Sequence, residues 1–244
     1  MLYRLRMRAK LLKRDFFERP TLVIARGLIG KYLVRRINGR TMSLMITEVE
    51  AYDGFDDEAS HASRGQTARN TPMFGEAGTI YVYFTYGMHW MLNIVCGKEK
   101  YPAAVLIRGG ILVGSAHTLT LASQNVSELY SLAKRYANRT ADPRRLKNGF
   151  VEKDTMPKLV YGPARLTKAL KIDKHLNGKM LSKKVGLWIE DRHSEVRPHC
   201  VVRTPRIGVS YAGKWAEKPW RFVLAQQKSG HTKSRSSGRT TRPR

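Results

Sequence analysis

The stretch Glu48-Val49-Glu50-Ala51-Tyr52 decides most of what the sequence says about fold and function. It ends a segment, Leu44 to Tyr52, that is predicted to be a β-strand. Because side chains alternate across a strand with period two, one face is expected to carry Ile46, Glu48, Glu50 and Tyr52. The other face, mostly apolar and suited to a core, is expected to carry Met45, Thr47, Val49 and Ala51. Two carboxylates and a phenol are therefore predicted to line a cleft.

Acidic residues gather at this stretch although the chain as a whole is basic. The 244 residues contain 45 Lys and Arg against 19 Asp and Glu, a formal net charge of +26. Six of the acids lie within residues 48–58, with no basic residue among them: Glu48, Glu50, Asp53, Asp56, Asp57 and Glu58. A chain that attracts polyanions has little reason to collect acids unless some of them take part in chemistry.

The positive charge is spread over the body of the chain as well as its ends. Residues 1–14 and 226–244 each hold six basic residues and no acid; removing these twelve charges from +26 leaves +14 on residues 15–225. A basic arm at 1–14 and a disordered basic tail at 226–244 are therefore predicted to flank one domain at 15–225. This pattern favours phosphate backbones as partners, although a ribosomal or membrane-surface protein has similar charge.

Length and composition narrow the class of protein. The chain is long enough for one large domain or two small ones, and its 42% hydrophobic content can form a core. No apolar run approaches the roughly 20 residues that span a bilayer. The Arg-rich start lacks the apolar region of a secretory signal; a transit peptide is an alternative to a disordered arm. Cys96 and Cys200, without a C-x-x-C motif, argue against a zinc ribbon or an iron–sulfur cluster and favour a reducing compartment.

Turn and cap signals divide the chain into helices and strands. Asn38-Gly39 between the extended runs Tyr32–Ile37 and Met42–Tyr52 favours a type I′ hairpin. Helices are predicted at Pro20–Leu28, Gln124–Tyr136 and Tyr161–Leu170, the last with Pro163 in its first turn. Further strands are predicted at Val185–Glu190, Cys200–Arg203, Arg206–Ser210 and Trp220–Ala225. Together these elements indicate a mixed α+β fold.

A long polar loop is predicted from Asp53 to Pro72, and long loops in compact domains are often functional. It contains His61, Arg64 and Arg69, together with an acidic cluster that could suggest a metal ion. However, the acids lack the ligand alternation and fixed glycine of a calcium loop, and one histidine supports zinc only weakly. A metal site is therefore the minor interpretation, and no cofactor is expected.

The stretch Thr79 to Cys96 is predicted to form a second hairpin that turns near Tyr86-Gly87. An aromatic side chain at a tight tip is a candidate wedge or stacking platform for nucleic acid, although it could equally pack back on its own domain. On the second strand, Asn93 lies among apolar residues, so its amide needs a partner if it is buried.

A further strand, Ala103–Ile107, is predicted to end at Arg108, which needs a salt bridge or a ligand there. Glu50 could activate water, and Tyr52, Tyr83 and His61 could hold a planar ring near it. A basic surface and a tip aromatic complete the requirements of an enzyme that flips a base out of a duplex and hydrolyses its glycosidic bond.

Several motifs in the correct order resemble the alkyladenine (3-methyladenine) DNA glycosylase family, from about Asp15 to Leu224. They are Glu48-Val49-Glu50-Ala51-Tyr52, Asp57-Glu58-Ala59-Ser60-His61, Arg69-Asn70, Met73-Phe74, Gly78-Thr79-Ile80-Tyr81-Val82-Tyr83, Tyr86-Gly87-Met88, Asn93, Val105-Leu106-Ile107-Arg108, Gly162-Pro163, Gly213-Lys214-Trp215 and Lys218-Pro219. The sequence departs from the family pattern after Arg108, at Ala68, and at Arg165, where lysine is usual.

The resemblance implies a single α+β domain with a curved antiparallel sheet, surrounding helices and a protruding hairpin. It implies a monofunctional, metal-free monomer that removes 3-methyladenine, 7-methylguanine, hypoxanthine and etheno-adducts from duplex DNA. Such an enzyme would work in the cytoplasm or nucleoid of a bacterium or in a eukaryotic nucleus, without a membrane. The residue roles that it implies are Glu50 as general base; Arg108 and the Ile207 carbonyl as holders of the water; Tyr52, His61, Tyr83 and Asn93 as the base pocket; Tyr86, Met88 and Leu106 as the intercalating group; and Arg64, Arg69 and Arg165 as phosphate contacts.

Two other classes of function remain open at this point. A non-catalytic basic nucleic-acid-binding protein accounts for the charge but not for the acidic cluster or the tip aromatic. A metal-dependent nuclease would use Glu48, Glu50 and Asp53. For Glu48 itself, the hypothesis is that its charge raises the pKa of Glu50.

Overall fold

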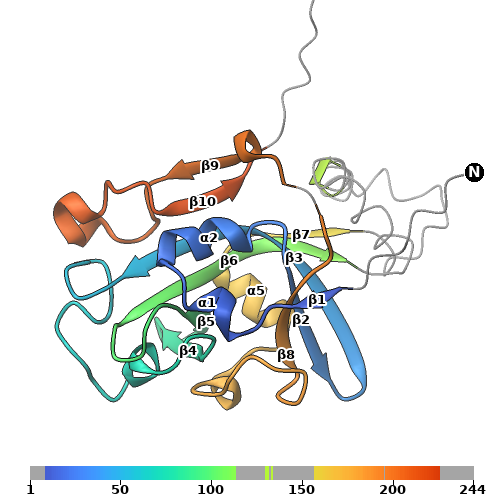
Figure 1. The fold of residues 1–244 in the computed structure, drawn as a ribbon, viewed down its shortest axis with the longest axis horizontal. Coiled ribbons are helices and arrows are strands. Elements are labelled where there is room, and N and C mark those ends of the chain that lie inside the picture. Colours follow the sequence, from blue (N-terminus) through green and yellow to red (C-terminus); the bar gives the residue numbers. More distant parts are fainter. Residues whose placement is uncertain (1–8, 114–129, 132, 134–156, 195, 226–244) are drawn as a thin grey trace, which may run out of the picture.

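The computed structural model describes residues 9–113, 130–131, 133, 157–194 and 196–225. These residues form a single α+β domain around one antiparallel sheet of ten strands, as expected from the sequence (Figure 1). The strands are β1 (Lys10–Leu11), β2 (Tyr32–Ile37), β3 (Arg40–Asp53), β4 (Ile80–Thr85), β5 (His89–Val95), β6 (Ala103–Val113), β7 (Lys158–Val160), β8 (Leu187–Asp191), β9 (Val201–Thr204) and β10 (Arg221–Leu224). The α-helices are α1 (Arg14–Phe17), α2 (Thr21–Leu28) and α5 (Pro163–Ala169), and the 3₁₀ segments are η1 (Thr71–Phe74), η3 (Lys174–Leu176), η4 (Pro198–Cys200) and η5 (Ser210–Trp215).

Strand β3 is the centre of the sheet. The main path runs β1-β8-β2-β3-β6-β5-β4, with β10 paired to both β3 and β9, and β7 paired to β6. The predicted turn between β2 and β3 is confirmed, because Asn38 and Gly39 both have positive φ (50° and 72°), as a type I′ turn requires. Glu50 lies far along β3, where the strand pairs with Leu106 of β6 and with Arg221 of β10.

Two opposed bulges interrupt the pairing of β3 with β6 beside Glu50. Ile46 pairs with Gly110 and Glu48 with Gly109, so Thr47 is an extra residue on β3; Val49 then pairs with Ile107, so Arg108 is an extra residue on β6. The bulges cancel and the register resumes. The predicted alternation is therefore wrong for Ile46, which lies before the bulge, but it holds for Glu50 and Tyr52. A bulge re-aims a side chain, and here the side chain is that of Arg108.

Helices α2 and α5 pack on the central strands and complete the core. Helix α2 lies along β3 and β6 (Figure 1), burying Thr21, Ile24, Ala25 and Leu28 at the i, i+3, i+4, i+7 spacing of an amphipathic helix. Helix α5, predicted at Tyr161–Leu170 with Pro163 in its first turn, begins at Pro163; it buries Leu166 and packs on β5 and β6. None of the described helices is long and apolar enough to cross a membrane.

Two further sequence predictions about local structure are wrong. Arg108 does not end a strand, since β6 continues through Gly109-Gly110 to Val113. The segment Arg206–Ser210 is not a strand: β9 ends at Thr204, Pro205 cannot donate a ladder hydrogen bond, and Gly208 has a φ of 79°. The predicted helix Gln124–Tyr136 lies mostly outside the described residues, as do the tail 226–244 and most of the arm 1–14.

Candidate active site

A cavity of about 320 Å³ opens on one side of the central strands. Its walls come from β3, the loop after β3, the hairpin β4–β5, β6, the start of α5 and the segment after β9. The lining residues are Tyr52, Ala59, His61, Met73, Tyr81, Tyr83, Thr85, Tyr86, Met91, Asn93, Ala104, Leu106, Arg108, Pro163, Ile207, Gly208, Val209 and Tyr211. The fold thus brings together eight of the predicted site residues: Tyr52, His61, Tyr83, Tyr86, Asn93, Leu106, Arg108 and Ile207.

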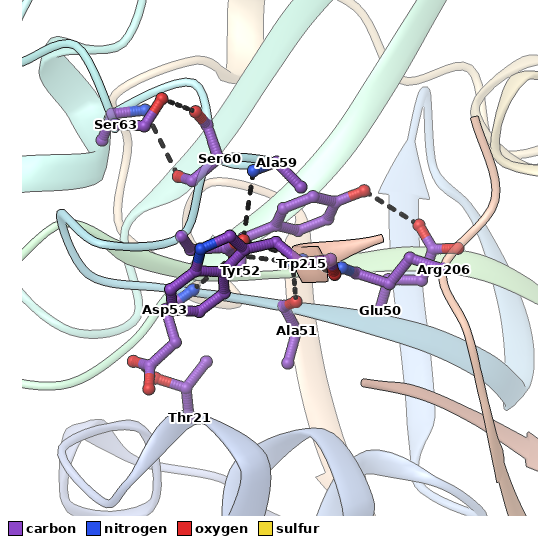
Figure 2. Close-up of polar contacts among 12 residues, drawn as sticks. Thr21, Glu50, Ala51, Tyr52, Asp53, Ala59, Ser60, Ser63, Arg206 and Trp215 are labelled. Atoms are coloured by element: carbon purple, nitrogen blue, oxygen red, sulfur yellow. Dashed lines mark hydrogen bonds and ion pairs between the residues drawn. The ribbon is translucent and has the colours of Figure 1, made fainter. Parts of the chain in front are cut away.

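Glu50 lies directly behind the wall of this cavity and has no exposed surface. Its Oε1 accepts the Ile207 main-chain N–H at 2.7 Å. Its Oε2 accepts the Tyr52 hydroxyl at 3.0 Å, the dashed line between these two residues in Figure 2. Oε2 also accepts Nη1 of Arg108 at 3.1 Å. All three donors belong to residues that line the cavity. Only the residues that bond the carboxylate therefore separate it from the interior of the cavity.

Burial raises the pKa of the Glu50 carboxyl above its ordinary value, because the charged form loses its hydration. The Arg108 charge, the Ile207 N–H and the Tyr52 hydroxyl all favour the anion and offset part of that rise. The charge of Glu48 does raise the pKa of Glu50, as hypothesised, but it is the smallest of the five causes. Glu50 is thus a carboxyl group whose basicity is increased by its surroundings while three donors hold it in place.

Glu48 serves mainly as an anchor for cations. Its Oε1 accepts Nε of Arg108 at 3.1 Å and Nε of Arg221 at 2.7 Å. Arg108 consequently bridges Glu48 and Glu50, as its bulged position on β6 permits. The salt-bridge alternative considered for Arg108 is confirmed, and the same guanidinium also lines the cavity.

Neutral aromatic rings form one wall of the cavity. The rings of His61 and Tyr83 meet edge to face with centroids 4.5 Å apart, and Nδ1 of His61 lies 3.1 Å from the Tyr81 hydroxyl. Although His61 is an exposed residue, desolvation of its ring by the surrounding side chains and the nearby Arg69 charge lower its pKa to about 4. Burial raises the pKa of Tyr83 to about 12. At neutral pH these rings therefore carry no charge.

Asn93 is buried in the floor of the cavity, and the partner that its amide needs is present. Its Nδ2 donates to the main-chain carbonyl of Tyr81 at 3.2 Å across the β4–β5 pair. This bond fixes the amide plane, while Asn93 and its strand neighbour Leu106 both contribute to the cavity lining.

The β4–β5 hairpin presents its tip to solvent at the mouth of the cavity. Tyr86 is 82% exposed and has a φ of 51°, an unfavourable conformation for a tyrosine; Gly87 follows with a φ of 64°. Met88 is exposed beside it but does not line the cavity. Of the two interpretations of the tip, the structure favours the one in which Tyr86 projects outward.

The three arginines predicted to contact phosphate are all exposed and do not line the cavity. Arg69 also contacts strand β4: its guanidinium lies 5.1 Å from the Tyr83 ring centroid, and its Nη2 donates to the Phe84 carbonyl at 3.3 Å. Arg64 follows His61 in the loop after β3, and Arg165 lies in the first turn of α5.

Two features of the site were not found from sequence. Tyr211, 70% exposed, lines the cavity and donates from its hydroxyl to the Ala59 carbonyl at 3.3 Å; nothing in its local sequence indicated this. Asp57 and Arg206 form a fully buried ion pair next to Tyr52. The acidic cluster was visible in the sequence, but its partner lies 149 residues away.

The acidic residues do not form a cage for a metal ion. Within the described residues, no three His, Cys, Asp or Glu side chains group closely enough to hold one. Glu48 and Glu50 are bridged by Arg108, and Asp53 instead accepts the Thr21 hydroxyl of α2 at 2.7 Å. The site is therefore built from a buried carboxylate, its donors and aromatic walls.

Such a site suits a hydrolase that attacks a bond next to a flat ring held in the cavity. The family model described as methylpurine-DNA glycosylase (MPG) matches residues 15–228. Three relatives carry the name "Putative 3-methyladenine DNA glycosylase". The one from Methanocella arvoryzae is 39% identical over 86% of this chain and 90% of its own; the one from Streptomyces avermitilis is 40% identical over 87% of each; the one from Clostridium botulinum is 36% identical over 89% and 97%. The chain belongs to the methylpurine-DNA glycosylase family. It is accordingly a DNA glycosylase, a hydrolase of DNA repair.

Proposed function

We propose that this enzyme is a monofunctional DNA glycosylase that flips alkylated or deaminated purines out of duplex DNA and hydrolyses their N-glycosidic bonds. The bases in question are 3-methyladenine, 7-methylguanine, hypoxanthine and ethenoadenine. The observation that carries the proposal is the Glu50 carboxylate, buried directly behind an aromatic cavity and held by donors from Ile207, Tyr52 and Arg108.

Glu50 is the general base in this proposal. A carboxylate has about four lone-pair positions, and the contacts among the described residues use two on Oε2 and one on Oε1. The remaining Oε1 position is the one from which Glu50 would take the proton of a water molecule. The water oxygen then bonds to C1′ of the sugar while the C1′–N bond breaks, and the electron pair of the broken bond leaves with the base. The negative carboxylate also stabilises the positive charge that develops on the sugar.

The uncharged aromatic walls of the cavity suit bases that are good leaving groups. A nucleotide of 3-methyladenine or 7-methylguanine carries positive charge on its ring, and aromatic faces attract such a cation. His61, with a pKa near 4, does not repel it at neutral pH. Bond cleavage turns these bases into neutral molecules, so no acid is required. Hypoxanthine would leave as an anion unless a proton reaches it, and its excision is expected to be slower.

Base selection would rest on the fixed groups around the ring. Tyr52, His61 and Tyr83 would hold the flipped base, and Asn93 would clash with the exocyclic amino group of normal guanine. The bond from Asn93 to the Tyr81 carbonyl supports this, because an anchored amide cannot turn aside.

Tyr86 would fill the gap that the flipped nucleotide leaves in the helix, with Met88 and Leu106 beside it. The exposed tip aromatic supports this role. Arg64, Arg69, Arg165 and the basic ends would bind phosphates, and the enzyme would act as a monomer wherever genomic DNA lies, in a nucleoid or a nucleus. The main-chain carbonyl of Ile207 would share the water with Glu50.

The test is excision by wild-type and Glu50→Gln enzyme from duplexes with one hypoxanthine or one 7-methylguanine, followed by hot alkali to cut abasic sites. We expect the variant to lose about 10²- to 10⁴-fold in single-turnover rate, the usual contribution of a general base. Glu99→Gln, at an exposed position, is the matched control and should excise normally. Equal excision by both variants would show that Glu50 is not the general base, and no excision by the wild type would favour the non-catalytic DNA-binding alternative.

A further inference from the structure

Asp57 and Arg206 form the most enclosed ion pair among the described residues. Both side chains have no exposed surface; Nη1 and Nη2 of Arg206 lie 2.6 and 2.7 Å from Oδ2 and Oδ1 of Asp57. The two parallel bonds are the strong, directional arrangement that arginine makes with a carboxylate. The pair joins the loop after β3 to the segment after β9.

Two of the other contacts of Arg206, to Ala51 and to Tyr52, lie next to Glu50. Asp57 also accepts the main-chain N–H groups of Asp53 and Ala59, both at 3.2 Å. Nη1 of Arg206 also donates to the Ala51 carbonyl at 2.9 Å, and Nη2 to the Trp215 carbonyl at 3.1 Å. The guanidinium lies 4.8 Å from the centroid of the Tyr52 ring. Figure 2 shows Arg206, Tyr52 and Glu50 together, with a dashed line at the Ala51 carbonyl that Arg206 bonds.

These contacts restrain residues around the Glu50 carboxylate, two of which, Ile207 and Tyr52, donate hydrogen bonds to it. Arg206 immediately precedes Ile207, whose N–H bonds Oε1. Ala51 immediately follows Glu50 on β3. Tyr52, whose ring Arg206 covers, bonds Oε2. A single buried guanidinium thus restrains the peptide, the strand and the ring that surround the carboxylate.

Stability alone is a poor explanation for this pair. A buried ion pair often stabilises a fold no better than apolar residues of similar size, because both charges lose their hydration. Nε of Arg206 is buried and has no hydrogen-bond partner in the described residues, which adds to that cost. What the pair supplies is a fixed geometry.

We propose that Asp57 and Arg206 are positioning residues that hold the Ile207 amide and the Tyr52 hydroxyl on Glu50. This inference rests on the proposed role of Glu50 as general base. We call the Asp57–Arg206 pair with its contacts the clamp. If the clamp is loosened, the Ile207 amide and the Tyr52 hydroxyl move away from the carboxylate and stabilise its anion less. The pKa of Glu50, which both donors lower, then rises further above its ordinary value.

The experiment compares Arg206→Lys and Asp57→Asn with wild-type enzyme. Lysine keeps the positive charge but cannot make the two parallel bonds. Arg192→Lys is the matched control: Arg192 is largely buried, lies 4.2 Å from the ring centroid of Tyr32, bonds Glu190 and Ser43, and, like Arg206, has a buried nitrogen without a hydrogen-bond partner in the described part of the chain. Arg192 does not line the cavity.

Two measurements are made on each protein, after its folded fraction has been determined by circular dichroism. The first is the single-turnover rate of 7-methylguanine excision as a function of pH, with the enzyme concentration that half-saturates the rate. The second is a titration of the Glu50 carboxyl carbon by ¹³C NMR, with Glu50→Gln to assign the signal. The second measurement does not depend on catalysis.

We expect Arg206→Lys to lower the maximal rate by up to about a hundredfold, the effect of misplacing a reacting group by roughly 1 Å. The half-saturating concentration should stay unchanged, and both the acid limb of the rate profile and the ¹³C midpoint should move to higher pH. Asp57→Asn should act in the same direction if it folds; Arg192→Lys should move neither.

An unmoved acid limb and an unmoved ¹³C midpoint in folded Arg206→Lys would overturn the inference, even if the rate fell with the folded fraction. Failure of the proposed function looks different: the wild type would then excise nothing, while the ¹³C comparison would still report whether the clamp acts on Glu50.

Discussion

Replacing Tyr86 by asparagine should raise the stability of the free protein and lower the rate of base excision. The chain contains two tight hairpin turns of the same kind, Asn38-Gly39 with φ of 50° and 72°, and Tyr86-Gly87 with φ of 51° and 64°. The first has the residues that this turn prefers. The second places a tyrosine in the left-handed region, which costs about 1–2 kcal/mol for most side chains. Strain of this kind is often retained at functional sites.

The magnitudes follow from the exposure of the tip. Tyr86 is 82% exposed, so its removal gives up little buried surface in the free protein. Asparagine tolerates the left-handed region, and the gain should be about 1 kcal/mol, which is about 2–4 °C in Tm for a domain of this size. Stacking of an aromatic ring on bases contributes about 1–3 kcal/mol, so excision at low enzyme concentration should fall about 5- to 150-fold.

The assays are thermal unfolding without DNA and single-turnover excision from a duplex with 2-aminopurine beside the lesion, whose fluorescence reports unstacking. The reciprocal change, Asn38→Tyr, is the control: it should lower Tm and leave excision by the folded protein unchanged. A lower Tm for Tyr86→Asn would mean that the ring packs on its own domain. Unchanged excision and fluorescence would mean that it is not a wedge.

Three further predictions concern other parts of the molecule. The acid limb of the rate profile should lie above the ordinary glutamate pKa, because burial raises the pKa of Glu50 and the base must be ionised; a limb at or below that ordinary value would contradict the role of a buried Glu50. Gly110→Ala should lower the free energy of unfolding by about 1–3 kcal/mol in urea melts, since its Cβ would overlap the Leu44 side chain and lie 2.5 Å from the Met45 carbonyl oxygen; an unchanged midpoint would contradict the close approach of β3 and β6. Deleting residues 226–244 should flatten the salt dependence of DNA binding by up to about 0.9 in log–log slope for each phosphate that the tail neutralises; an identical slope would show that the tail does not bind DNA.

Local sequence signals predicted the elements that depend on neighbouring residues. Asn38-Gly39 specifies its turn by backbone sterics alone, and Pro163 marks the start of α5. The alternation that placed Glu50 and Tyr52 on one face needs only period two, and their hydroxyl–carboxylate contact confirms it. These are the cases in which a few adjacent residues determine the geometry.

Predictions failed where a partner strand or a distant residue decides the geometry. The bulges at Thr47 and Arg108 exist only in the pairing of β3 with β6, so Ile46 was assigned to the wrong pattern and Gly109-Gly110 was mistaken for a strand end. Arg206 was assigned to a strand, whereas its burial against Asp57 draws that segment away from the sheet. No local pattern contains such information.

The central location of Glu50 has a consequence for how this protein moves. Its strand is hydrogen-bonded on both sides, to β6 and to β10, and its amides should exchange with solvent water only when the whole domain opens. The tip at Tyr86 belongs to the β4–β5 hairpin at the sheet edge and should exchange within far shorter times. The hairpin tip can therefore change shape while the strand that carries Glu50 keeps its hydrogen bonds.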